Sequence, residues 1–117
     1  MKENNVIAKK SYQFAIRMVK LSKYLQTEQR EFILSKQILR SGTSIGANIE
    51  EGLGGQSRKD FIAKFYISYK EARETHYWLR LLRDTGSLDE KLASSLITDC
   101  EEILKLLTSI LKTTKNN

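Results

Sequence analysis

The stretch RSGTSIGANIEEG, residues 40–52, gathers small side chains in the middle of a chain that otherwise favours helices. Apolar residues continue into and through it at helical spacing, as at Ile38 and Ile45, which indicates a helix rather than a turn or a ligand-binding loop. Gly42 and Gly46 each lower helix propensity by about 1 kcal/mol relative to alanine, an effect that the close approach of a neighbouring helix can offset. The stretch therefore predicts a tightly packed helix.

Three residues of this stretch are candidates for close helix packing: Gly42, Gly46 and Asn48. Asn48 is predicted to turn toward the core, where a buried amide needs a hydrogen-bond partner. Gly46→Leu should destabilise the protein, because the larger side chain would overpack the contact.

The composition indicates one all-helical domain spanning residues 1–117. The chain has 117 residues, no proline and 40% hydrophobic residues, which favours uninterrupted helices around a single core. We expect the tail, residues 113–117, to fray. No apolar run approaches the roughly 20 residues that span a bilayer, and the N-terminal residues MKENNVIAKK lack the apolar region of a secretory signal. A cytoplasmic protein is the resulting expectation.

Hydrophobic periodicity predicts four helices. They extend over about residues 5–25, 28–51, 57–85 and 87–112. Thr27 is the expected N-cap of the second helix, and Ser57 and Ser87 each begin a sequence typical of a capping box. Gly86 suits the left-handed position that ends the third helix. Long helices joined by short loops predict an up-down-up-down antiparallel four-helix bundle.

The predicted third helix carries apolar residues on both faces, and one small bundle cannot cover both. Ile67, Trp78 and Leu81 lie opposite its core row, so we expect self-association into a homo-oligomer. Carboxylates in the same outer row, paired with Arg or Lys, would set the register of the subunit contact. A flanking apolar strip on the first helix also needs a partner. The candidate interface comprises Tyr12, Ile16, Val19, Ile67, Glu71, Glu74, Trp78 and Leu81.

The net charge of +6 is unevenly distributed along the chain. Residues 1–25 carry six Lys or Arg against Glu3 alone, whereas residues 87–117 carry four lysines against five acids. A basic helix can follow a phosphate backbone, although a solvated lysine face is the ordinary alternative. Binding would depend on charge and shape more than on base sequence. The candidate nucleic-acid-binding residues are Lys9, Lys10, Arg17, Lys20 and Lys23.

The residue types needed for catalysis are sparse. His76 is the only histidine, whereas the di-metal sites of ferritin-like bundles need two Glu-x-x-His motifs. We expect His76 to have a hydrogen-bonded packing role and Cys100 to be a small buried residue. The glycines of residues 52–55 match no phosphate-binding motif and indicate an ordinary connection. We therefore expect no catalytic residue, no metal, no cofactor and no small-molecule substrate.

Two motifs together, RSGTSIGANIEEG and KEARETHYWLRLL (residues 70–82), resemble the family of proteins encoded in intervening sequences of bacterial 23S ribosomal RNA genes. The similarity covers nearly the whole chain. Many members have proline where this chain has Gly46, and glycine permits a helix bend without enforcing one. The usual form of the first motif is matched by Arg40, Ser41, Ser44, Ile45, Asn48, Ile49, Glu51 and Gly52.

This resemblance implies a four-helix bundle that assembles as a homopentamer. It extends to the accessory proteins of diversity-generating retroelements, which are basic pentamers that bind nucleic acid, and it supplies no catalytic residues. The leading hypothesis is a non-enzymatic, oligomeric bundle that binds structured RNA or DNA through basic faces. The alternative is a structural or protein-interaction oligomer with no nucleic-acid role.

Overall fold

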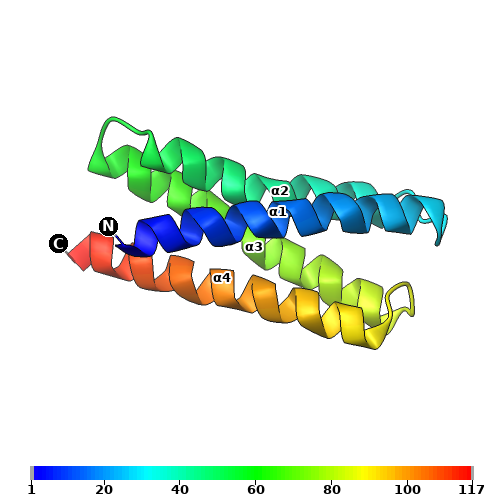
Figure 1. Ribbon diagram of the computed structural model, residues 1–117. Coiled ribbons are helices and arrows are strands. Elements are labelled where there is room, and N and C mark those ends of the chain that lie inside the picture. The colour runs from blue at the N-terminus through cyan, green and yellow to red at the C-terminus, as the bar shows by residue number, and fades with distance from the viewer. Residues whose placement is uncertain (1, 117) are drawn as a thin grey trace.

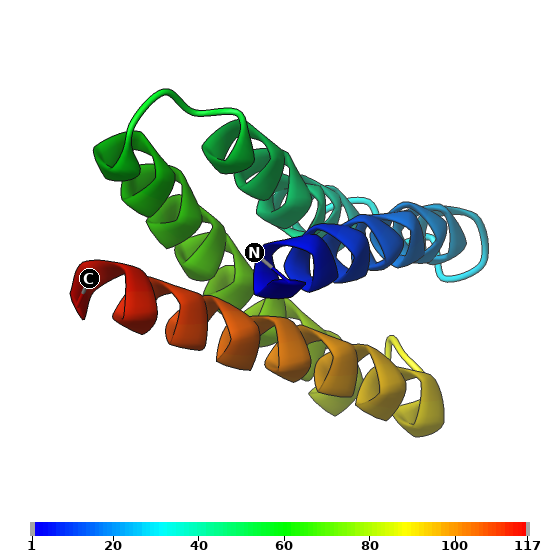
Figure 2. The ribbon, with the colours of Figure 1, turned by 60° about the vertical axis from the view of Figure 1, so that its left-hand side comes forward.

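A computed structural model describes residues 2–116 of the chain, and these residues form four α-helices and no strand. The helices are α1 (Lys2–Thr27), α2 (Leu34–Leu53), α3 (Arg58–Asp84) and α4 (Glu90–Asn116). They run up-down-up-down, so that the two ends of the chain and the α2–α3 loop lie at the same end of the molecule (Figures 1 and 2). The predicted all-α, antiparallel four-helix arrangement is confirmed.

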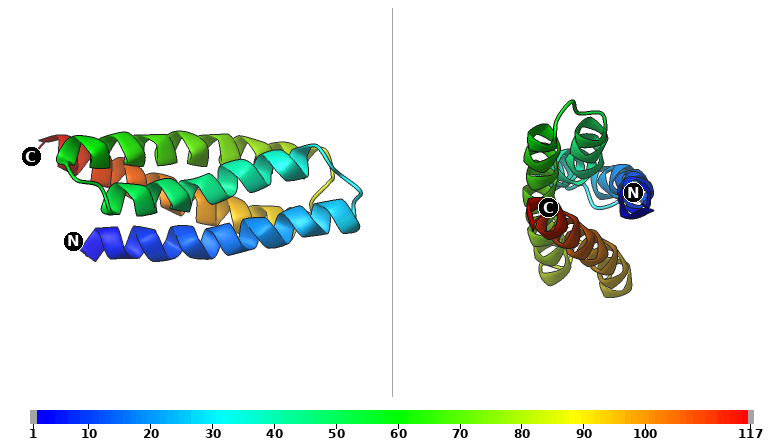
Figure 3. Two further views of the ribbon diagram at one scale, coloured as in Figure 1. Left: turned by 90° about the horizontal axis from the view of Figure 1, so that it is seen from above. Right: turned by 90° about the vertical axis from the view of Figure 1, so that its left-hand side faces the viewer.

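The molecule is a rod of 46 × 21 × 19 Å. Each helix packs against the next in sequence, and α1 also contacts α4, so the helices surround one core (Figure 3). Apolar residues at helical spacing on each helix fill this core, and Phe14, Ile45, Phe65 and Leu107 are among the fully buried ones. No helix within residues 2–116 is both long and apolar enough to cross a membrane.

The first predicted helix boundary is wrong. Thr27 is the last residue of α1 and its hydroxyl donates to the Lys23 carbonyl at 2.8 Å, so it serves the helix that it ends. The second helix begins only at Leu34. One of the free amides of its first turn is satisfied by Glu31, whose carboxylate accepts a hydrogen bond from the Ser35 amide at 2.8 Å.

The end of α3 matches the prediction, since Gly86 has a φ of +78° directly after the helix. The Gly86 amide donates to the Arg83 carbonyl at 3.2 Å and the Ser87 amide to the Leu82 carbonyl at 3.0 Å. These two bonds satisfy carbonyls that the helix end would otherwise leave unpaired. Ser87 is thereby held in the turn that terminates α3.

The two predicted capping boxes differ in outcome. The Ser57 hydroxyl accepts a hydrogen bond from the Asp60 amide at 3.0 Å, which confirms the start of α3. At α4, however, the capping side chain is Asp89, which accepts from the Leu92 amide at 3.1 Å. The expected cap at Ser87 is wrong because that residue belongs to the preceding turn. At its other end α4 stays helical through residue 116, which includes most of the tail expected to fray.

The glycines of the opening stretch lie where α2 approaches α1. A Cβ added to Gly42 would lie 2.3 Å from Cγ of Met18, and one added to Gly46 would lie 3.3 Å from the Ser11 carbonyl oxygen. Both glycines are buried. The half-buried Asn48 donates its side-chain amide to the Ser44 carbonyl of its own helix at 2.8 Å. The close contact between α1 and α2 thus depends on glycine, which has no side chain, at positions 42 and 46.

Candidate nucleic-acid interface

Two of the candidate basic residues of α1 are turned toward α4. Nζ of Lys10 lies 3.4 Å from a carboxylate oxygen of Glu102. Nη1 of Arg17 lies 2.5 Å from a carboxylate oxygen of Asp99, and Nη2 donates to the Ser95 hydroxyl at 3.1 Å. These side chains are partly exposed, so each pair contributes only about 0–1 kcal/mol. Their positive charge is nevertheless offset locally by the acids of α4.

The other three candidates, Lys9, Lys20 and Lys23, are exposed on α1 and form no ion pair within residues 2–116. The surface around them is partly apolar, because Tyr12 is 67% exposed and Ile16 is 41% exposed. The five predicted residues therefore do not form one continuous basic strip.

A second basic surface lies in a groove of about 900 Å³ between α3 and α4, which we call the α3–α4 groove. Its cationic residues are Arg73 and Arg80 of α3 with Lys105 and Lys112 of α4. None of these four side chains has an ion-pair partner in the described part of the chain. None of these four residues is among the candidate nucleic-acid-binding residues predicted from the sequence.

Acidic and basic side chains of α4 lie on different faces of the helix, so the charge of the segment as a whole does not indicate the groove. Asp99 and Glu102 face α1, whereas Lys105 and Lys112 face α3. Counting charges along residues 87–117 gives a near-neutral segment and hides both faces. The sequence does contain a signal for the groove. Arg73 and Arg80 are seven residues apart, as are Lys105 and Lys112, and a spacing of two helical turns places each pair on one face of its helix.

His76 also lines the α3–α4 groove and is half-buried. Its Nε2 lies 3.0 Å from Oε2 of Glu101, so it joins α3 to α4 by a polar contact. Within residues 2–116, no three His, Cys, Asp or Glu side chains are grouped so as to hold a metal ion.

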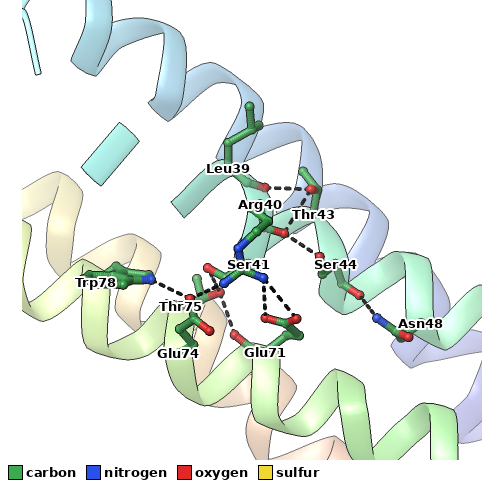
Figure 4. A network of polar contacts seen from close by, with 10 residues as sticks. All are labelled: Leu39, Arg40, Ser41, Thr43, Ser44, Asn48, Glu71, Glu74, Thr75 and Trp78. Carbon is green, nitrogen blue, oxygen red and sulfur yellow. Dashed lines mark hydrogen bonds and ion pairs between the residues drawn. The ribbon is translucent and has the colours of Figure 1, made fainter. Parts of the chain in front are cut away.

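The two sequence motifs meet at Arg40 of α2 (Figure 4). Its Nη1 lies 3.3 Å from both carboxylate oxygens of Glu71, and its Nη2 is bonded to Glu74. The indole N–H of Trp78 donates to the same Glu74 carboxylate at 3.0 Å. The sequence predicts that these carboxylates, once paired with Arg or Lys, set the register of a subunit contact; within the chain they are paired with Arg40. They join α3 to α2, a tertiary pairing that periodicity alone does not reveal.

The electrostatics of this cluster favour charged side chains. Burial raises the pKa of Glu74, but the hydrogen bonds from Trp78 and Arg40, together with the Arg40 charge, outweigh it and hold the pKa below its ordinary 4.5. The pKa of Arg40 is raised, mainly by its hydrogen bond to Glu74. Both groups remain ionised at neutral pH.

Buried hydroxyl groups beside this cluster also join α2 and α3. The Thr75 hydroxyl donates to the Ser41 hydroxyl at 2.8 Å, and the Ser68 hydroxyl donates to the Ile45 carbonyl at 2.9 Å. Small polar residues therefore let the helices approach closely while their own hydrogen-bonding groups stay satisfied.

The candidate oligomer-interface residues are unequally exposed. Ile67 of α3 is 41% exposed and Val19 of α1 is 38% exposed. Tyr12 and Ile16, the other two candidates on α1, are exposed as well. Trp78 and Leu81 are half-buried, and the Trp78 ring packs against the core. Trp78, which the sequence places opposite the core row of α3, has apolar and polar partners within its own chain, so only part of its ring is exposed for contact with another copy.

Comparison with known proteins identifies the family. The family described as 23S rRNA-intervening sequence protein matches residues 3–109. A crystal structure of a protein of unknown function from the S23 ribosomal protein family of Bacteroides thetaiotaomicron VPI-5482 is 55% identical and has a TM-score of 0.92. The match covers 94% of this chain and 98% of that one. Comparison with curated proteins gives no match. The chain belongs to the 23S rRNA-intervening sequence protein family.

Proposed function

We propose that this protein is a non-enzymatic, homo-oligomeric bundle of the cytoplasm that binds nucleic acid through basic surfaces. The observation that carries the proposal is the excess of unpaired positive charge. Only five of the 20 Lys and Arg side chains form ion pairs within residues 2–116. Side chains that are not held by acids of the same chain are available to neutralise phosphates and release their counterions.

The unpaired cations lie on more than one face of the bundle. Lys9, Lys20 and Lys23 are exposed on α1, and the α3–α4 groove carries four further cations. The arrangement favours recognition of the charge and shape of RNA or DNA over recognition of base sequence.

Exposed apolar side chains support assembly into a homo-oligomer. Tyr12, Ile16 and Val19 of α1, together with Ile67 of α3, lie on the surface, where contact with another copy would remove them from water. The family resemblance implies a pentamer. Several copies would present several basic surfaces, and weak contacts made by linked copies gain avidity.

Two measurements on the purified protein test this proposal. Light scattering should give a mass several times the chain mass of 13.5 kDa, and a monomer at micromolar concentration would contradict assembly. Fluorescence anisotropy with a labelled RNA hairpin and a labelled DNA duplex should show binding at about 50 mM salt. An oligomer that binds neither probe would instead support the alternative, a structural or protein-interaction role.

A further inference from the structure

We propose that the α3–α4 groove is a binding site for single-stranded nucleic acid. This inference rests on the proposed function and assigns it to one surface, which differs from the basic helix that the sequence singles out. The groove combines unpaired cations on both walls with aromatic side chains along one wall, and single-strand-binding proteins commonly use this combination.

The charge of the groove is strongly positive. Arg73 and Arg80 on one wall face Lys105 and Lys112 on the other. The only acid that lines the groove is Glu101, and its carboxylate is already in contact with His76. None of the four cations forms an ion pair within residues 2–116, although the Arg80 guanidinium also lies over the Tyr77 ring, so an incoming phosphate would meet little competition from acids of the same chain.

The cations are spread along the groove rather than gathered at one point. Two residues seven positions apart on a helix lie about 10.5 Å apart along its axis, which applies to both cationic pairs. The contact between His76 and Glu101 sets the register of the antiparallel helices, with Arg80 toward one end and Lys112 toward the other. At about 1.5 Å per residue, Arg80 and Lys112 are separated by about 22 Å along the helix axes. This length suits a nucleic-acid strand better than a single phosphate group.

Aromatic side chains lie in and beside the α3 wall of the groove, since the Tyr66 ring lies 6.1 Å from the Tyr69 ring and the Tyr77 ring contacts Arg80, a groove residue. Tyr69 lines the groove itself, and Tyr66 and Tyr77 are 47% and 50% exposed. Nζ of Lys115 lies 5.7 Å from the ring centre of Tyr66, and the Arg80 guanidinium lies 5.7 Å from that of Tyr77. Exposed rings can stack on unpaired bases, whose faces are covered in a duplex. This feature favours a single strand as the ligand.

The test compares two quadruple variants that lose the same charge. The groove variant carries Arg73→Gln, Arg80→Gln, Lys105→Gln and Lys112→Gln. The matched variant carries Lys2→Gln, Lys9→Gln, Lys20→Gln and Lys23→Gln on the exposed side of α1. Circular dichroism and light scattering must first show that both retain the helicity and mass of the wild type.

The probe is a fluorescein-labelled oligouridine of about 12 nucleotides, long enough for a typical single-strand site, and a duplex of equal length is the comparison. Four phosphate contacts to a single strand correspond to a salt slope of about −2.8. Between about 50 and 200 mM salt, wild-type affinity should therefore fall roughly 50-fold more than that of the groove variant. The α1 variant should keep more of the wild-type slope than the groove variant does.

A second variant tests the aromatic contribution without changing charge. Tyr66→Leu with Tyr77→Leu should weaken oligouridine binding by about 5-fold or more and leave duplex binding unchanged, because only the single strand offers base faces. Equal effects on both probes, or none on the oligouridine, would overturn the assignment to single strands.

The outcomes separate the two proposals. If the wild type binds neither probe, the proposed function fails and the groove assignment fails with it. If the wild type binds, but the α1 variant loses affinity as much as or more than the groove variant, only the groove assignment is overturned. Selective loss in the groove variant would support both.

Discussion

Substitution of Gly42 by alanine tests whether the small residues of the opening stretch are required by close packing. An added Cβ would lie 2.3 Å from Cγ and 3.0 Å from Cβ of Met18, distances too short for unstrained carbon atoms. Met18 is 0% exposed, so its side chain is enclosed by core neighbours and has no direct path into solvent. The conflict involves Cγ, Sδ at 2.7 Å and Cβ of Met18, and because Cβ is fixed by the backbone of α1, rotation of the side chain alone does not relieve every contact.

Two opposing effects decide the magnitude. Alanine at a helix interior position favours the folded state by about 1 kcal/mol relative to glycine. Overpacking of a filled core typically costs about 1–3 kcal/mol. Gly42→Ala should therefore lower the free energy of unfolding by about 0–2 kcal/mol despite its better helix propensity.

Gly46→Ala is the matched control, since it lies one turn along the same helix and gains the same propensity. Its nearest neighbour would be the Ser11 carbonyl oxygen at 3.3 Å, a contact that needs a much smaller adjustment. The difference in free energy of unfolding between the two alanine variants removes the propensity effect. We expect Gly42→Ala to be the less stable of the two by about 1 kcal/mol or more.

The assay is urea denaturation followed by far-ultraviolet circular dichroism at one fixed protein concentration, because assembly makes apparent stability depend on concentration. The variants are repeated in a Met18→Ala background, where the obstructing side chain is absent. There Gly42→Ala should stabilise the protein by up to about 1 kcal/mol. If Gly42→Ala stabilises the wild-type background as much as Gly46→Ala does, the reasoning is refuted.

Three further predictions concern other parts of the bundle. Gly46→Leu should lower the free energy of unfolding by about 1–3 kcal/mol, because its side chain extends toward the α1 backbone at Ser11, and an unchanged urea midpoint would contradict the contact. The folded-state pKa of Glu74 is depressed, so its contribution to stability is present above about pH 4.5 and is lost as the pH falls through the lowered value. Urea titrations at several pH values should show that Glu74→Gln reduces this acid destabilisation and that the control Glu50→Gln, at an exposed position, does not. Burial, with smaller effects from Glu101 and Asp99, raises the pKa of the Cys100 thiol to about 12. A thiol reagent should therefore react with the native protein only as fast as the protein unfolds, and rapid reaction at pH 8 would place the thiol at the surface.

Most of the architecture could be predicted from hydrophobic spacing, because core residues recur with the helical period wherever a helix has one buried face. The prediction that Gly42 and Gly46 belong to a helix is confirmed, since apolar residues continue at helical spacing on either side of them. Local turn chemistry was less predictable. Thr27 and Ser87 have the side chains of helix caps, but each is bonded to the helix that precedes it.

The candidate site could be predicted only in part, because charge acts through faces in three dimensions. Lys10 and Arg17 belong to the most basic segment of the sequence, yet in the structure both contact acids of α4. Lys105 and Lys112 belong to a near-neutral segment, yet both line the α3–α4 groove together with Arg73 and Arg80. The packing of α3 against α4, which no single segment specifies, creates that groove.

The pairing of Arg40 with Glu71 and Glu74 shows the same limit. Their carboxylates were recognised as charges on an apolar row, but their partner lies about 30 residues earlier in the chain. Only the side-by-side packing of α2 and α3 brings the groups together. The two motifs that indicate the family are thus contacting parts of one helix–helix interface (Figure 4).

The central claim, that this bundle binds nucleic acid through unpaired surface cations, is tested most directly by the salt dependence of wild-type affinity for labelled RNA. We predict that the logarithm of the association constant falls linearly with the logarithm of salt concentration, with a slope of about −3 or steeper. Affinity that does not change with salt, or no binding at about 50 mM salt, would contradict the account.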